Sequence, residues 1–171
     1  MWFLENCIVR RASSTDLGRI EEFLKGLTEL EKAYFSEEML DLFFSDSDTL
    51  IAEINDEIVG IAVIKYSKEK GKKHIAHLLI TVKEELRGKG IGYNLSKVAE
   101  EIAIEKGISK FKIETPTFNI YTISRAEIWG YRREAYLAKE FYLGGKYYDL
   151  VVLSKMLQKE SRVNFNYFQY D

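Results

Sequence analysis

The stretch that most limits how this chain can fold is 77–106, HLLITVKEELRGKGIGYNLSKVAEEIAIEK. It opens with an apolar, β-branched run from His77 to Val82, which predicts a buried strand. From Ile91 onward, apolar side chains recur at the spacing of an amphipathic helix. The strand and the helix are separated by a turn with three alternating glycines, Gly88, Gly90 and Gly92.

This glycine turn predicts an anion-binding site. The first turn of a helix carries backbone N–H groups without partners, and the helix dipole makes that end partly positive. Glycine lets a phosphate approach the backbone closely and permits a positive φ. Arg87 and Lys89 add two positive charges. We therefore expect a pyrophosphate site, the alternative being an ordinary turn with two solvated basic residues.

Two nucleotide-binding motifs compete for the same turn. A Walker loop requires Gly-x-x-x-x-Gly-Lys-Ser/Thr, and the chain contains no such run. A dinucleotide fingerprint begins at Gly88-x-Gly90, but Tyr93 stands where its third glycine belongs. Glu114 lies about 20 residues further on, where that fold places the acid that binds the ribose. This alternative predicts a doubly wound sheet with repeated strand–helix alternation.

The order of the expected elements favours a different sheet. Before the turn we expect a strand at 7–11, helices at 16–31 and 36–44, and strands at 49–54 and 58–66. After it we expect a helix from 91, a strand at 109–115, a helix at 119–128, and strands at 131–141 and 147–155. The strands on either side of the helix from 91 should be parallel. We therefore predict an α/β (α+β) fold with a mixed, mostly antiparallel central sheet, one β-α-β crossover and flanking helices. Gly60, in the middle of a strand, predicts a bulge or a close backbone approach.

Three separated segments resemble the GNAT family of N-acetyltransferases. Arg87-x-x-Gly90-x-Gly92 after an apolar strand is similar to that family's acetyl-CoA signature. Asn119, followed by Gly130-Tyr131, resembles the segment that closes over the cofactor. The run GGKYYDLVVLS at 144–154 is close to the end of the ribosomal-protein N-terminal acetyltransferase branch. The resemblance covers about residues 7–156 and implies the GNAT (acyl-CoA N-acyltransferase) fold.

The resemblance also implies which residues bind acetyl-CoA. In the family the end of the central strand pairs with the pantetheine arm, a role that falls here on Ile80, Thr81 and Val82. The loop amides hold the pyrophosphate, which here implies Arg87, Gly88, Lys89, Gly90, Ile91, Gly92 and Tyr93. Asn119 would bond the pantetheine or the pyrophosphate region.

Acetyl transfer to an amine needs a positioned thioester, a general base and a proton for the leaving thiolate. Glu114 is the first candidate base, because partial desolvation at the end of a central strand would favour proton uptake. His77 is the second, because imidazole titrates near neutrality. The structural alternatives are a Glu114 paired with a lysine and a His77 that is only hydrogen-bonded. The backbone N–H of Val82 is the candidate donor to the oxyanion.

The general acid is the departure from the family pattern. A tyrosine usually stands four residues before the Gly-Phe pair, and here that position is Ala126. Tyr121, on the same predicted helix, is our candidate, and Tyr142 is another. Protonation of the thiolate by water, or a loss of catalysis, are the alternatives.

Length and composition set the remaining bounds. A chain of 171 residues suits one domain, placed at 1–156, with an aromatic tail at 157–171 packed on it or at a dimer edge. The net charge of −2 argues against general nucleic-acid binding. The lone Cys7 excludes disulfide frameworks and cysteine-rich zinc sites, and we expect no metal. Without a signal peptide or the roughly 20 apolar residues that span a bilayer, we expect a cytoplasmic protein with no membrane partner.

The sequence thus predicts an N-acetyltransferase that moves the acetyl group of acetyl-CoA directly to a primary amine. The acceptor is a protein N-terminus, a lysine or a small amine. Two alternatives stay open, an acyl-CoA-binding sensor or scaffold without catalysis and a nucleotide-binding domain. Homodimer formation is also open.

Overall fold

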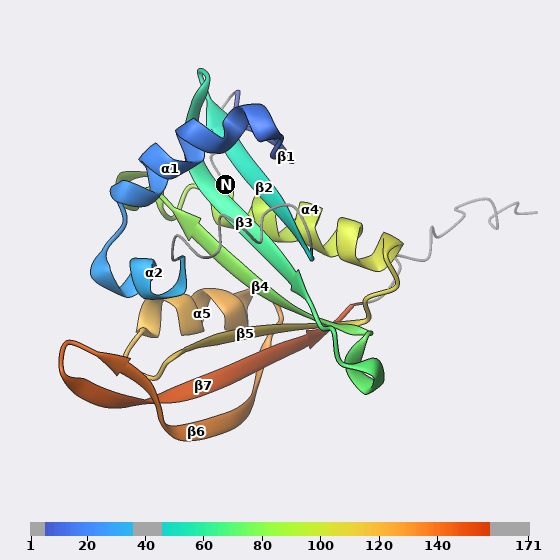
Figure 1. Cartoon of the computed structure of the whole chain (residues 1–171), viewed down its shortest axis with the longest axis vertical. Helices are drawn as coiled ribbons and strands as arrows, with labels where there is room; N and C mark the ends of the chain where they lie inside the picture. The colour runs from blue at the N-terminus through green and yellow to red at the C-terminus, as the bar shows by residue number, and fades with distance from the viewer. Residues whose placement is uncertain (1–5, 36–45, 158–171) are drawn as a thin grey trace, which may run out of the picture.

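The computed structural model describes residues 6–35 and 46–157, and its centre is a seven-stranded sheet (Figure 1). The strand order is β1-β2-β3-β4-β5-β7-β6. Only β4 and β5 are parallel, and the other neighbouring strands in this sheet are antiparallel. The predicted mixed, mostly antiparallel sheet with one crossover is confirmed. The doubly wound alternative is wrong, because it requires repeated parallel pairs.

The strands agree with the predicted ranges to within a few residues. They are β1 (Ile8–Arg11), β2 (Ser47–Ile54), β3 (Glu57–Tyr66), β4 (Ile75–Val82), β5 (Lys110–Pro116), β6 (Arg132–Leu143) and β7 (Lys146–Met156). The described helices are α1 (Leu17–Lys25), α2 (Glu29–Tyr34), α4 (Ile91–Glu105) and α5 (Ile120–Ile128), with 3-10 turns at Ser14–Asp16, Lys70–Lys72 and Glu84–Leu86. The helix expected at 36–44 and nearly all of the aromatic tail lie outside the described residues.

The single helix predicted at 16–31 is wrong, because the chain breaks into α1 and α2. Gly26 is the C-cap of α1, and Thr28 is the N-cap of α2. The Thr28 side chain accepts the N–H of Glu31, while the Glu31 carboxylate accepts the N–H of Thr28 at 2.9 Å. This is a capping box, which starts a new helix. The apolar residues keep helical spacing on both sides of the break, so the spacing alone predicts one continuous helix.

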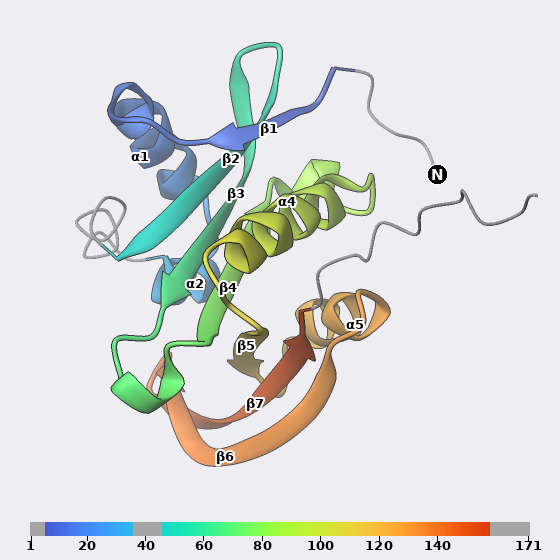
Figure 2. The same cartoon turned by 90° about the vertical axis from the view of Figure 1, so that its right-hand side faces the viewer.

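The helices cover both faces of the sheet (Figure 2). Helices α4 and α5 pack on one face, where Leu95, Ala99 and Ile123 join the larger apolar core. Helix α1 packs on the other face, where Ile20 and Phe23 meet a smaller cluster. None of the described helices has the length and apolar character needed to cross a membrane.

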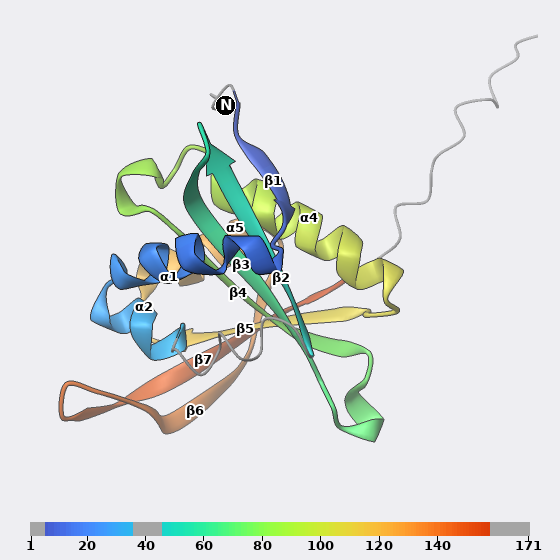
Figure 3. The same cartoon turned by 45° about the horizontal axis from the view of Figure 1, so that its top comes forward.

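The two parallel strands separate along their length (Figure 1, Figure 3). Strand β4 pairs with β5 only from Ile75 to His77, opposite residues 110–112. Beyond this point β4 stays paired with β3 as far as Val82, and β5 stays paired with β7 as far as Pro116. The sheet therefore opens in its middle between the ends of β4 and β5.

Both features predicted for Gly60, a β-bulge and a close backbone approach, are present. The register between β2 and β3 shifts between Ala52 and Glu53, so a bulge lies at this point. A Cβ on Gly60 would lie 3.2 Å from the carbonyl oxygen of Thr81. The close approach of β3 to the end of β4 therefore requires glycine.

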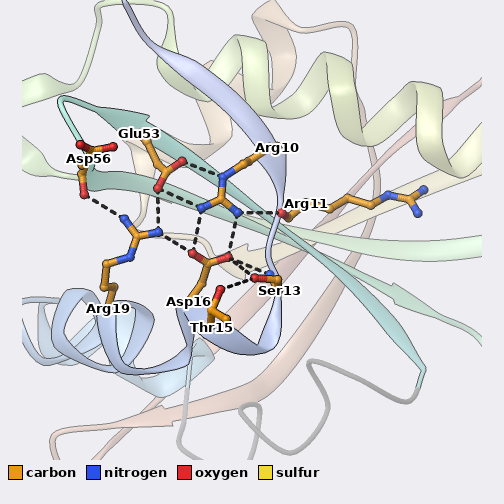
Figure 4. A network of polar contacts seen from close by, with 8 residues as sticks. All are labelled: Arg10, Arg11, Ser13, Thr15, Asp16, Arg19, Glu53 and Asp56. Carbon is orange, nitrogen blue, oxygen red and sulfur yellow. Dashed lines mark hydrogen bonds and ion pairs between the residues drawn. The ribbon is translucent and has the colours of Figure 1, made fainter.

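A polar network holds β1, α1 and β2 together (Figure 4). The Arg10 guanidinium donates to both oxygens of Asp16 at 2.8 Å, and its Nε donates to Glu53 at 2.8 Å. Arg19 contacts the same two carboxylates. Asp16 is only 2% exposed, and the hydrogen bonds from Arg10 hold the pKa of its carboxyl far below its usual range.

Candidate functional site

The gap between β4 and β5 opens into a cleft of about 500 Å³. Its walls are the ends of both strands, the turn before α4, the start of α5, and α2. Most of the predicted site residues line it: Ile80, Thr81, Val82, Arg87, Gly88, Gly90, Gly92, Tyr93, Glu114, Asn119 and Tyr121. The cleft therefore gathers residues that are spread over 42 positions of the sequence, from 80 to 121.

Three predicted residues stand apart from this lining. The side chain of Ile91 is 2% exposed and packs into the core beneath α4, so only its amide can face a ligand. Lys89 is exposed beside the cleft, where it contributes charge. His77 lies where β4 and β5 part, next to Glu114.

The turn before α4 forms a cradle of free backbone amides. Gly88 and Gly90 have φ values of 77° and 89°, in the left-handed region that favours glycine. Gly90 is the N-cap of α4, and the helical bond to its carbonyl comes from the N–H of Asn94 at 3.0 Å. The N–H groups of residues 91–93 precede that bond and point out of the helix end. This geometry suits a phosphate.

The edge of β4 supplies a second set of backbone groups. The N–H of Lys83 donates to the carbonyl of Val59 on β3 at 2.9 Å. Because hydrogen-bonding direction alternates along an antiparallel strand, the backbone groups of Ile80 and Val82 point the other way, toward the gap. The Nε of Arg87 reaches the Val82 carbonyl at 3.1 Å, which agrees with this direction. An extended chain of amides placed in the gap could form hydrogen bonds with the backbone groups of Ile80 and Val82.

Glu31 on α2 is a cleft residue that the sequence analysis missed. Its Oε1 accepts hydrogen bonds from the hydroxyl of Thr81 and from Nη2 of Arg87, both at 2.6 Å. Burial acts to raise the pKa of Glu31, but the hydrogen bonds from Thr81 and Thr28 and the Arg87 charge outweigh it, so the pKa is lowered. Glu31 is therefore ionised at neutral pH. It already partners Arg87, which the sequence presented as a mobile charge.

The two candidate bases lie together where β4 and β5 part, Glu114 in the cleft wall and His77 next to it. Nδ1 of His77 is 3.5 Å from Oε1 of Glu114. Burial lowers the pKa of His77; the Glu114 charge opposes this shift, and nearby lysines on three segments, Lys112, Lys65 and Lys72, reinforce it. His77 is therefore neutral at neutral pH and able to accept a proton. The Glu114 side chain is 37% exposed, so the desolvation expected for it is not found.

Asn119 and Tyr121 begin α5 at the cleft wall. The Asn119 side chain accepts the N–H of Thr122 at 3.3 Å and donates to the Thr115 hydroxyl at 3.0 Å, so it caps α5 and ties it to β5. The Tyr121 ring lies 5.6 Å from the guanidinium of Arg87 and 5.5 Å from that of Arg125. Such cation–π contacts place the ring beside the charges of the turn.

The other tyrosine positions differ from the sequence expectation. Ala126 is 1% exposed in the core, so the methyl group there leaves no polar side chain at the position of the family tyrosine. Tyr142 lies at the β6–β7 hairpin, beside Tyr147 with ring centroids 4.9 Å apart and planes tilted by 54°, and does not line the cleft. The cleft instead contains Tyr34, a second residue that the sequence analysis missed.

The described residues contain no cluster of three or more His, Cys, Asp or Glu side chains suited to a metal ion. The cleft has backbone amides at both the turn and the strand edge and the Glu114 carboxylate in its wall, with the His77 imidazole next to that carboxylate. These groups can bind a phosphorylated, amide-containing ligand and accept a proton.

The chain belongs to the acetyltransferase (GNAT) family, whose family model matches residues 19–131. The resemblance drawn from the glycine turn is therefore confirmed. Members of this family use acetyl-CoA, and the cradle and strand edge described above fit that molecule.

Solved structures of acetyltransferases share the fold. The GNAT-family acetyltransferase of Streptococcus pneumoniae is 23% identical, with a TM-score of 0.76 over 90% of this chain and 100% of its own. A ribosomal-protein-alanine N-acetyltransferase from Brucella melitensis is 20% identical, with a TM-score of 0.70 over 88% of this chain and 99% of its own. The yncA protein of Salmonella typhimurium, solved with its cofactor acetyl-CoA, is 16% identical, with a TM-score of 0.70 over 92% of this chain and 97% of its own.

Proposed function

We propose that this protein is an N-acetyltransferase that moves the acetyl group of acetyl-CoA directly to a primary amine. One observation carries the proposal: the cleft between the diverging ends of β4 and β5 leads to the free amides at the start of α4. A long ligand with a diphosphate in its middle and amides along one arm matches this sequence of groups.

The cofactor roles follow the geometry. The amides of residues 91–93, with Gly88 and Gly90 in the left-handed conformation, bind the diphosphate, and Lys89 adds charge beside it. The backbone groups of Ile80 and Val82 bind the pantetheine amides. The Thr81 hydroxyl has a different role, since it is bonded to Glu31. Asn119 contributes by holding α5 at the cleft wall.

The reaction needs a positioned thioester and a group that accepts the amine proton. Acetyl-CoA supplies the activated acetyl group when it is bound. Glu114 and neutral His77 lie together where a proton can be accepted from the attacking amine. The N–H of Val82 points into the gap, where it can donate to the carbonyl oxygen of the thioester. Positioning both reactants in one cleft supplies much of the rate.

The acceptor is an amine of one of three classes: a protein N-terminus, a lysine or a small amine. Glu114 brings a carboxylate to the cleft that can pair with a cationic acceptor, whereas the carboxylate of Glu31 is already paired with Arg87. The similarity of the closing β6–β7 region to the ribosomal-protein branch supports a protein N-terminus. A sensor that binds acyl-CoA without turnover is the second candidate, favoured by the alanine at position 126.

The test combines calorimetry with an amine panel. We expect coenzyme A to bind, NAD and ATP to bind at least tenfold more weakly, and acetyl-CoA to be consumed with at least one amine. Coenzyme A binding without turnover on peptide, lysine and polyamine acceptors would favour the sensor. An absence of coenzyme A binding would overturn both.

A matched pair of glycine variants makes the binding test specific. Gly90 and Gly107 both have positive φ, 89° and 80°, and a Cβ on either would meet nothing within 4 Å. An alanine at either position strains the backbone by about 1–2 kcal/mol. Gly90→Ala also places a methyl group at the cradle, so it should weaken coenzyme A binding at least tenfold. Gly107→Ala should lose similar stability and bind normally.

A further inference from the structure

Tyr34 is a cleft residue with a buried hydroxyl. The Oη atom is buried and makes no hydrogen bond of normal geometry with any of the residues described, 6–35 and 46–157. Removing a hydroxyl from water without a replacement bond costs about 1–3 kcal/mol. A phenol in the wall of a ligand cleft without a hydrogen bond of normal geometry to the described residues is a donor available to a ligand.

The ring of Tyr34 is held firmly from two sides. It stacks on Phe141 of β6, with ring centroids 5.2 Å apart and planes 12° apart. Three residues earlier, and so on the same side of α2, Glu31 is bonded to Thr81 and Arg87. Helix α2 therefore spans the open part of the sheet, anchored to β4 at one end and to β6 at the other. This anchoring fixes where the hydroxyl points.

The surroundings of Tyr34 keep it protonated. Burial raises the pKa of the Tyr34 phenol above its ordinary value, and the Glu114 charge adds to the rise. A contact with the Thr115 hydroxyl, outside normal hydrogen-bond geometry, opposes it. The charged groups in the cleft wall around it are Glu31, Glu114, Arg87 and Arg125. A phenol that stays neutral at working pH donates a hydrogen bond without releasing its proton.

We propose that Tyr34 donates a hydrogen bond to the sulfur of acetyl-CoA as the carbon–sulfur bond breaks, the role that Ala126 leaves without a side chain. This inference rests on the proposed acetyl transfer. The amine nitrogen forms a bond to the carbonyl carbon, the bond from carbon to sulfur breaks, and the amine proton passes to Glu114. The sulfur leaves as a thiolate bonded to the Tyr34 hydroxyl and then takes a proton from water, while Glu114 returns its proton to water.

The test is Tyr34→Phe, which keeps the stacked ring and removes only the hydroxyl. A hydrogen bond to a charged group contributes about 1.5–3 kcal/mol, so kcat should fall roughly 10- to 100-fold. The KM for acetyl-CoA and the Kd for coenzyme A should stay within about twofold. The Tm should be unchanged or higher, because the variant loses a buried hydroxyl that makes no hydrogen bond of normal geometry with the residues described. Tyr142→Phe, at the exposed β6–β7 hairpin, is the matched control and should leave every quantity unchanged.

A second readout does not depend on turnover. The thiolate absorbance of bound coenzyme A is followed against pH, with the spectrum of protein alone subtracted. A donor at the sulfur stabilises the thiolate, so the bound thiol should have a pKa about one unit higher in Tyr34→Phe than in the wild type. Tyr142→Phe should match the wild type.

The outcomes separate this inference from the proposed function. If the wild type does not bind coenzyme A, the proposed function fails and this inference fails with it. If it binds and Tyr34→Phe matches the wild type in both kcat and thiol pKa, only the role of Tyr34 is overturned. If the wild type binds without turnover, the thiol pKa alone decides.

Discussion

Replacing Glu31 by glutamine tests the link between α2 and the cleft. The side chain is 18% exposed and accepts hydrogen bonds from three segments: one from Thr81 on β4, one from Arg87 in the glycine turn, and two from Thr28, through its N–H and its hydroxyl. Glutamine carries no charge and offers only one acceptor oxygen. At least one of these donors then loses its partner.

The magnitude follows from the contacts that are lost. A hydrogen bond to a charged group contributes about 1.5–3 kcal/mol, and water reaches this bridge because Arg87 is 28% exposed, so we take about 2 kcal/mol. For a chain of 171 residues, that loss lowers Tm by about 4–8 °C. Because α2 also positions Tyr34, kcat should fall as well, while the Kd for coenzyme A should stay within about threefold.

The effect also has a defined pH dependence. The pKa of Glu31 is lower in the folded protein than in the unfolded chain, where it is about 4.3. Its contribution to stability is therefore fully present above that value and is lost as pH falls through the folded pKa. The Tm difference between the wild type and Glu31→Gln should be constant from pH 8 to pH 6 and shrink below about pH 4.

The assay is thermal unfolding across this pH range, with Glu29→Gln as control. Glu29 lies on the same helix but is 86% exposed, and its carboxylate is 3.5 Å from Nζ of Lys32. Glu29→Gln should shift Tm by less than about 1 °C. The reasoning would be refuted if both variants gave the same Tm, or if the Glu31→Gln difference persisted unchanged at low pH.

Three further substitutions test other parts of the structure. Glu114→Gln should lower kcat about 100-fold or more with little change in coenzyme A affinity, and an unchanged kcat would remove Glu114 from the reaction. Asp16→Asn should lower the unfolding free energy by about 2 kcal/mol at neutral pH, a moderate figure because Arg10 and Arg19 are 38% and 40% exposed. Since the pKa of Asp16 is lowered, this difference should begin to shrink as pH falls below about 4 in acid titration and keep shrinking toward the folded pKa, and a pH-independent difference would contradict the account. Gly60→Ala should lose about 1–3 kcal/mol in urea unfolding, because its Cβ would lie 3.2 Å from the Thr81 carbonyl, and full stability would show that β3 can shift.

The local pattern of the sequence was enough to predict the strand, the glycine turn and α4. Each signal there lies within a few residues of the structure it specifies: the β-branched run, the glycines at positive φ, and the helical spacing from Ile91. The strand–helix–strand order added the parallel pairing of β4 with β5. These parts of the account depend on short-range chemistry and on one crossover.

The contacts that cross the cleft could not be predicted in the same way. Glu31 meets Thr81 and Arg87 from 50 and 56 residues away along the chain. Its sequence signal, the Thr28-x-x-Glu31 capping box, points only to a helix start. In the sequence, Tyr34 looks like one more apolar position after the start of α2. Its place in the site depends on its contact with Phe141 and on its position in the cleft wall. Both arise only when the chain folds.

The catalytic residues are predicted least completely, for a physical reason. Glu114 and His77 are adjacent in space because β4 and β5 are still paired at residue 77. Their exposure depends on how far the strands then separate, and no local pattern encodes that distance. A sequence can therefore indicate a base by residue type without indicating its environment.

The central claim is that the free amides at the start of α4 bind the diphosphate of coenzyme A. A crystal structure of the protein with coenzyme A tests this most directly. The account predicts phosphate oxygens within hydrogen-bonding distance of the N–H groups of residues 91–93, and the pantetheine arm between β4 and β5. A diphosphate bound elsewhere, with the gap between those strands empty, would contradict it.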